Sequence, residues 1–131
     1  MKILAFFLVV TTLACQQQSA SYVNSYLVNP ATFLRTIDSI PNEILIDVRT
    51  PDEQQQGFIK DALFIDFKND SFRADLDKLD KTKPVMVYCA AGGRSGRTAK
   101  VLQELGFKTI YDLKGGIGAW KTNDLPVYFL D

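Results

Sequence analysis

The fold of this chain is decided by residues 84–97, whose sequence is PVMVYCAAGGRSGR. Residues 84–88 are apolar without alternation, which is typical of a strand buried on both faces of a sheet. A glycine-containing loop follows, and a helix is expected from Ser95 to Leu105, where Gly106 closes it. This order of strand, loop and helix is the repeating unit of a parallel sheet.

The rest of the chain alternates strands and helices in the same way. Asn29-Pro30 predicts a helix to about Asp38, and Thr50 with Glu53 predicts a capping box that opens a helix ended by Gly57. The remaining expected elements are strands at 43–48, 62–65 and 109–113, a short apolar stretch at 26–28, and helices at 72–79 and 117–122. The pattern predicts an α/β fold with an open, mostly parallel sheet and helices on both faces.

Composition excludes several chemistries. The chain has 131 residues, enough for one domain with a core, and contains no histidine and two cysteines. Catalytic pairs with histidine and zinc sites made of Cys and His are therefore excluded, and no metal or cofactor is expected. The formal net charge of zero argues against a nucleic-acid partner. Chemistry must come from a thiol, carboxylates, basic side chains or backbone amides.

The N-terminal segment is typical of an export signal. Lys2, an apolar run over residues 3–10 and Ala14 before Cys15 indicate a signal peptide at 1–14, with Cys15 as a lipidation site. The similarity is to bacterial lipoprotein signals; the alternative is a secretory signal cut elsewhere. Residues 15–24 would then be a lipidated polar tether and 25–131 the folded domain, with its core at 40–125. This predicts a bacterial envelope protein anchored in a membrane, with the domain in the periplasm or on the surface.

Cys89 is the candidate catalytic residue, because it ends a buried strand where ligands bind in parallel sheets. The residues of the loop after it are Ala90, Ala91, Gly92, Gly93, Arg94 and Ser95. Glycines let successive N–H groups turn toward one atom, and the helix N-terminus with Arg94 and Arg97 adds positive charge. Such surroundings lower the pKa of a thiol without a base. The alternative is an inert buried thiol.

These residues resemble the single-domain rhodanese-like sulfurtransferases. The matching segments are Asp47-Val48-Arg49, Glu53, residues 57–62, the loop 89–95, and Gly115-Gly116-Ile117-Gly118-Ala119-Trp120. The chain departs from that pattern at Phe58, where the family usually has histidine, and at Asp61, where it usually has glycine; we expect both positions to serve the fold. The loop also has no basic residue between Cys89 and Arg94, where members that use thiosulfate often carry one.

The resemblance implies transfer of a sulfane sulfur through a Cys89 persulfide. The donor would be thiosulfate or a polysulfide, and the acceptor a thiol, cyanide or a partner protein's cysteine. Arg94 would brace the loop or attract an anionic donor. Asp47 and Arg49 would connect the neighbouring strand end to the loop, with a purely structural ion pair as the alternative. We further expect that Cys89→Ala costs little stability and that Trp120 fills the core.

Two other functions compete with this interpretation. Cysteine phosphatases and arsenate reductases also place a thiolate in a loop that ends in arginine, but four residues separate Cys89 from Arg94, one fewer than in the phosphatase loop. A shorter loop favours one sulfur atom over a tetrahedral oxyanion. The second alternative is a non-catalytic rhodanese-fold module that binds partners at the envelope; such modules often lack the cysteine that this chain retains.

Overall fold

The structure is a computed structural model that describes residues 22–131. The predicted signal peptide (1–14), Cys15 and most of the predicted tether lie outside the described residues. The first strand begins at Asn24, one residue before the predicted start of the domain. No helix within the described part is long and apolar enough to cross a membrane.

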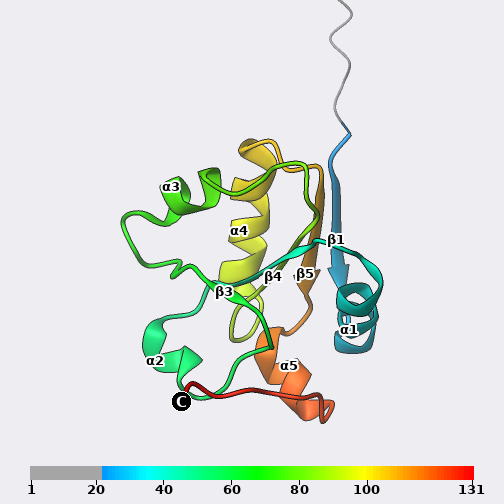
Figure 1. The fold of residues 1–131 in the computed structure, drawn as a ribbon, viewed down its shortest axis with the longest axis vertical. Helices are drawn as coiled ribbons and strands as arrows, with labels where there is room; N and C mark the ends of the chain where they lie inside the picture. Colours follow the sequence, from blue (N-terminus) through cyan, green and yellow to red (C-terminus); the bar gives the residue numbers. More distant parts are fainter. Residues whose placement is uncertain (1–21) are drawn as a thin grey trace, which may run out of the picture.

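A five-stranded sheet forms the centre of the described chain (Figure 1). The strands are β1 (Asn24–Val28), β2 (Ile44–Asp47), β3 (Leu63–Phe64), β4 (Val85–Tyr88) and β5 (Thr109–Leu113). Their order is β1-β5-β4-β2-β3, and every neighbouring pair is parallel. The predicted open parallel sheet is therefore confirmed, with β4 at its centre.

Helices cover both faces of the sheet, as predicted (Figure 1). They are α1 (Pro30–Ser39), α2 (Pro51–Gln54), α3 (Phe72–Asp77), α4 (Gly93–Glu104) and α5 (Gly116–Thr122). One core lies under α3 and α4 and contains Val87, Leu76 and Leu102. The other lies under α1 and α5 and contains Met86, Phe33 and Trp120. All four residues of β4 are buried, because each face of the strand supplies one of these cores.

The observed elements differ from the sequence-based boundaries at their ends. The helix after Cys89 begins at Gly93, two residues before the expected Ser95, because Gly92 takes a positive φ of 108° and turns the chain sharply. The strand expected at 62–65 pairs only at Leu63 and Phe64, since it lies at the edge of the sheet. The stretch at 26–28 belongs to the opposite edge strand, β1, which pairs with β5.

Candidate active site

Cys89 lies immediately after β4, at the carboxyl edge of the sheet, and is 1% exposed. The backbone N–H of Gly92 donates a hydrogen bond to its Sγ at 3.1 Å. Its thiol donates to the hydroxyl oxygen of Ser95 at 3.5 Å, and Ser95 itself is fully buried in the first turn of α4. The loop therefore folds back over the sulfur, and polar groups from the loop and the helix converge on that one atom.

The pKa of Cys89 lies below that of an ordinary thiol. Burial by itself raises this pKa, but the nearby Ser95 hydroxyl and the amides of Ser95, Gly92 and Ala91 stabilise the thiolate and outweigh burial. These groups stabilise the thiolate, so the donors expected from the sequence are present around the sulfur. Arg94 is close enough for its positive charge to be stabilised by a Cys89 thiolate.

The start of α5 supports the Cys89 loop through hydrogen bonds to its backbone. The N–H of Ile117 donates to the carbonyl of Cys89 at 2.9 Å, and the N–H of Gly118 donates to that of Ala90 at 3.0 Å. Gly116 has a positive φ of 60°, and a Cβ there would lie 2.5 Å from the carbonyl oxygen of Cys89. The glycine pair of the sequence motif therefore lets α5 approach the backbone of the loop.

Arg94 is held by Glu53 of α2. Its two terminal nitrogens donate to the two carboxylate oxygens of Glu53 at 2.7 and 2.6 Å. Glu53 also accepts hydrogen bonds from the N–H and hydroxyl of Thr50. The bidentate bond to Arg94 holds the pKa of Glu53 well below its usual range, and the same bond raises the pKa of Arg94. Of the two roles expected for Arg94, the geometry supports bracing of the loop.

Asp47 and Arg49 form a buried ion pair, with the shortest N–O distance 2.6 Å. The remaining donors of Arg49 bind the carbonyls of Glu53 and Gly57 at 3.0 and 2.8 Å. Burial lowers the pKa of Arg49, but the hydrogen bonds and charge of Asp47 raise it by more. The pair therefore fixes the turn that carries Glu53, and through Glu53 it reaches Arg94.

Arg97 lies further from the chemistry than its position in sequence suggested. Because α4 begins at Gly93, Arg97 is the fifth residue of the helix, past its first turn. Its guanidinium lies over the ring of Phe67, 4.9 Å from the ring centre, and the residue is exposed.

The expectation about stability at Cys89 needs correction. We expected Cys89→Ala to cost little because an open loop packs loosely, but Cys89 belongs to the core formed with Val48 and Val87. Loss of its sulfur leaves a small cavity, so a cost of about 1 kcal/mol is expected.

Two features of the site were not predicted. The pairing of Glu53 with Arg94 joins residues 41 positions apart. Its signal was present, since Glu53 and Arg94 each follow one of two strands that we expected to lie in one parallel sheet. The support of the Cys89 loop by the amides of Ile117 and Gly118 had no signal beyond the neighbouring glycines. Among residues 22–131, no group of three or more His, Cys, Asp or Glu side chains is placed to hold a metal ion.

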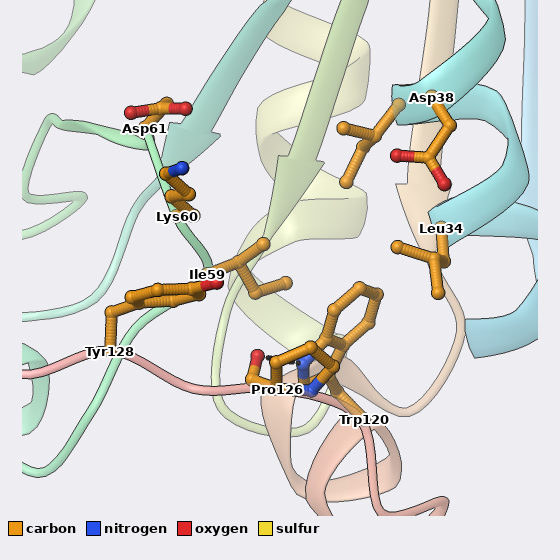
Figure 2. A pocket seen from close by; sticks show the side chains of 9 residues that line it. Leu34, Asp38, Ile59, Lys60, Asp61, Trp120, Pro126 and Tyr128 are labelled. Carbon is orange, nitrogen blue, oxygen red and sulfur yellow. Dashed lines mark hydrogen bonds between the residues drawn. The ribbon is translucent and has the colours of Figure 1, made fainter.

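A cavity of about 380 Å³ lies on the other side of the sheet (Figure 2). Its walls include Leu34, Ile59, Trp120, Pro126 and Tyr128, and none of its lining residues belongs to the Cys89 loop. Trp120 is 1% exposed and its indole N–H donates to the carbonyl of Pro126 at 2.9 Å. The expected core position of Trp120 is confirmed.

Phe58, the departure from the family pattern, packs in the fold. Its ring lies edge-on to that of Phe64, with centroids 5.1 Å apart, and its backbone pairs with Tyr128 of the C-terminal segment. These contacts agree with a structural role at this position.

Fold and site together define a single α/β domain with a thiol-bearing loop at the carboxyl edge of a parallel sheet. The family model described as a rhodanese-like domain matches residues 29–123, so the chain belongs to the rhodanese-like domain family.

Curated relatives of the chain are named as sulfurtransferases. A sulfurtransferase of Allochromatium vinosum is 36% identical over 84 residues, which cover 64% of this chain and 77% of the relative. Thiosulfate sulfurtransferase GlpE of Coxiella burnetii is 38% identical over 80 residues, which cover 61% of this chain and 73% of the relative.

Solved structures share the fold. A rhodanese-related protein from Thermoplasma volcanium superposes with a TM-score of 0.71 at 30% identity, covering 80% of this chain and 99% of that protein. The 30 kDa polysulfide-sulfur transferase homodimer of Wolinella succinogenes gives a TM-score of 0.68 at 32% identity, covering 82% of this chain and 80% of that protein.

Proposed function

We propose that this protein is a rhodanese-type sulfurtransferase that carries a sulfane sulfur on Cys89. The observation that carries the proposal is the arrangement around Sγ, where the Gly92 amide at 3.1 Å and the Ser95 hydroxyl at 3.5 Å surround a thiol of lowered pKa. The names of the relatives, which include a thiosulfate and a polysulfide transferase, support the same class of reaction.

The reaction proceeds in two displacements at sulfur. The Cys89 thiolate attacks the outer sulfur of the donor, an S–S bond forms, and the rest of the donor leaves with the electron pair of the broken bond. The loop amides then stabilise the terminal sulfur of the persulfide, as an oxyanion hole stabilises oxygen. In the second step an acceptor thiolate or cyanide attacks that sulfur, and the Cys89 thiolate is the leaving group.

The loop closely surrounds the sulfur of Cys89, which favours a substrate with a narrow reacting end. Cys89 is 1% exposed, so a reacting atom has to enter between the loop groups that surround Sγ. A single sulfur or the end of a polysulfide chain needs less room there than a tetrahedral phosphate. Arg94 is already bound to Glu53, and residues 90–93 carry no positive charge. We therefore expect a polysulfide to load Cys89 faster than thiosulfate at equal concentration.

Mass spectrometry of the intact protein tests the proposal. After incubation with polysulfide or thiosulfate, we expect the mass to rise by about 32 Da, one sulfur atom, at Cys89 and to return to its starting value when cyanide is added. Cys89→Ser should gain no sulfur and form no thiocyanate. If no donor loads Cys89, the domain is a binding module; turnover of an aryl phosphate that depends on Cys89 would instead indicate a phosphatase.

The N-terminal sequence supports a second proposal, that the protein is exported and anchored to a membrane through lipid on Cys15. A lipid on Cys15 would hold the domain at the envelope, where a partner protein's cysteine could accept the sulfur. Expression in a bacterium with a clickable fatty acid tests this. The natural chain and Cys89→Ala should both take up label and sediment with membranes, whereas Cys15→Ala should do neither. Equal labelling of Cys15→Ala would contradict the proposal.

A further inference from the structure

The cavity on the α1 and α5 side of the sheet has no role in the proposed reaction. Its volume of about 380 Å³ lies within the range of small-molecule sites in proteins, roughly 300–1,000 Å³. The buried residues Ile59 and Trp120 form its floor, and the half-buried Leu34 and Ile37 of α1 form one wall (Figure 2). The charged residues at its rim are exposed, so a ligand can enter from solvent.

Two carboxylates lie on opposite sides of the rim. Asp38 belongs to the last turn of α1, and Asp61 belongs to the segment before β3; Figure 2 shows the cavity between them. Within residues 22–131, neither carboxylate forms an ion pair. Both negative charges are therefore available to a cationic ligand.

Asp61 holds its carboxylate at a backbone position that favours glycine. Its φ is 63°, in the left-handed region, where a residue with a side chain is strained. Glycine takes this conformation without strain and is the usual residue here in the rhodanese-like pattern. Phe58, the other departure from that pattern, packs on Phe64, whereas the Asp61 side chain is exposed at the cavity rim. Asp61 therefore fits a role at the cavity better than a role in the fold.

Lys60 supplies the positive charge at this rim. Its ammonium lies over the ring of Tyr128, 5.9 Å from the ring centre, and is attracted to the face of that ring. Among the described residues that line the cavity, Lys60 and the two aspartates are the charged ones, which leaves the rim with an excess of one negative charge. An apolar floor below a negative rim favours a ligand with an apolar body and a positive end.

We propose that this cavity binds a small organic amine. The apolar body of the ligand lies against Ile59 and Trp120, and its ammonium lies near the carboxylates of Asp38 and Asp61. Removal of the apolar body from water supplies most of the affinity, and ion pairs at the exposed rim select the charge of the ligand. None of the lining residues belongs to the Cys89 loop, so binding of the amine requires no sulfur transfer.

The NMR signal of the Trp120 indole N–H tests the proposal in the full chain. The chain has one tryptophan, so the signal is unambiguous, and this N–H donates to the carbonyl of Pro126, which also lines the cavity. The probes are phenethylammonium, 2-phenylethanol and 3-phenylpropionate, which share a phenyl ring and differ in charge. We expect phenethylammonium to shift the signal with a Kd on the order of 1 mM. It should bind at least about fivefold more tightly than 3-phenylpropionate.

Asp38→Asn and Asp61→Asn should each weaken phenethylammonium binding about two- to fivefold and leave 2-phenylethanol binding unchanged. Asp124→Asn is the matched control and should bind as the natural chain does. Asp124 is also an exposed aspartate with a positive φ, of 55°, but it does not line the cavity.

An indole signal that phenethylammonium does not shift up to its solubility limit would overturn the proposal. Binding of 3-phenylpropionate as tight as that of the amine would also overturn it, as would an unchanged affinity in either Asp38→Asn or Asp61→Asn. Cys89→Ser should bind the amine normally, because the cavity lies apart from the thiol. A failure of this proposal is therefore distinguishable from a failure of the sulfurtransferase assignment.

Discussion

Arg94 shows how a single residue can act by position. Its guanidinium makes two short bonds to Glu53, and both side chains are largely withdrawn from solvent. A charge that is already paired attracts an anionic donor weakly, whereas a bidentate pair holds the backbone of residues 89–94 in one arrangement. The geometry of the Cys89 loop therefore depends on the shape of Arg94 more than on its charge.

Arg94→Lys separates these two contributions. Lysine keeps the charge but makes one bond where arginine makes two, so we expect the rate of persulfide formation to fall at least about tenfold. The free energy of unfolding should fall by about 1–2 kcal/mol. Stopped-flow loading with polysulfide and denaturant unfolding measure the two effects. Arg73→Lys is the matched control, because its pair with Glu104 is exposed and contributes little. Full activity of Arg94→Lys would show that charge alone suffices.

Glu53 makes stability depend on pH in the acid range. Its pKa in the folded protein lies below the ordinary value of 4.5, chiefly because Arg94 binds the carboxylate. The stabilisation is complete above the unfolded pKa and is lost as the pH falls toward the folded pKa.

We therefore expect natural protein to be more stable than Glu53→Gln at neutral pH and the difference to narrow below about pH 4.5. Urea unfolding of both proteins over this range measures the difference. A constant difference at all pH values would contradict the assignment.

Among the elements, α5 determines how the Cys89 loop is supported. Its amides at Ile117 and Gly118 bind the carbonyls of Cys89 and Ala90, while the amide of Gly92 in the same loop binds the sulfur. This contact requires the backbone of Gly116 to lie against Ala90, so no side chain fits between the two segments.

Gly116→Ala tests this contact. The added methyl group would meet backbone atoms at 2.5 Å, and the positive φ of 60° is strained for alanine. We expect a loss of stability of about 2 kcal/mol or more and slower persulfide formation, because the loop carbonyls must move.

Gly93→Ala is the control for stability. No atom lies within 4 Å of its Cβ position, and its φ is not positive. Alanine at the start of α4 should therefore leave the melting temperature unchanged or raise it. Equal destabilisation by both substitutions would show that crowding at Gly116 is not the cause.

The whole molecule consists of two cores separated by the sheet, and the chemistry lies against only one of them. Cys89 and Ser95 face the core under α3 and α4, whereas Trp120 fills the core under α1 and α5, on the far side of β4. Substitutions in the second core should therefore lower the stability of the domain more than they lower the rate of sulfur transfer.

Trp120→Ala should reduce the free energy of unfolding by about 3–5 kcal/mol, which is a large part of the stability of a small domain. Thermal unfolding followed by circular dichroism measures the loss, and Trp120→Phe, which keeps a ring in place, should lose less. Where the Trp120→Ala protein is still folded, at low temperature, persulfide formation should approach that of the natural protein. A stable but inactive Trp120→Ala protein would contradict the assignment of Trp120 to folding rather than to sulfur transfer.

The sequence by itself determined the class of fold and the position of the thiol. Strand and helix patterns along the whole chain predicted the fold, and residues 84–97 predicted the position of the thiol. Both predictions were possible because hydrophobic periodicity, glycines and helix-capping residues act over a few neighbouring residues. The predicted export signal and Cys15 remain predictions from the same kind of local pattern.

Only the tertiary structure decided which residues meet around the Cys89 loop. Glu53 and Arg94 are 41 residues apart, and Gly116 at the start of the last helix lies against the backbone of Cys89 and Ala90. Their roles follow from strand order and register, which depend on how the whole sheet packs against its helices. Local sequence cannot encode these distances, since the same short motifs fit many arrangements of strands.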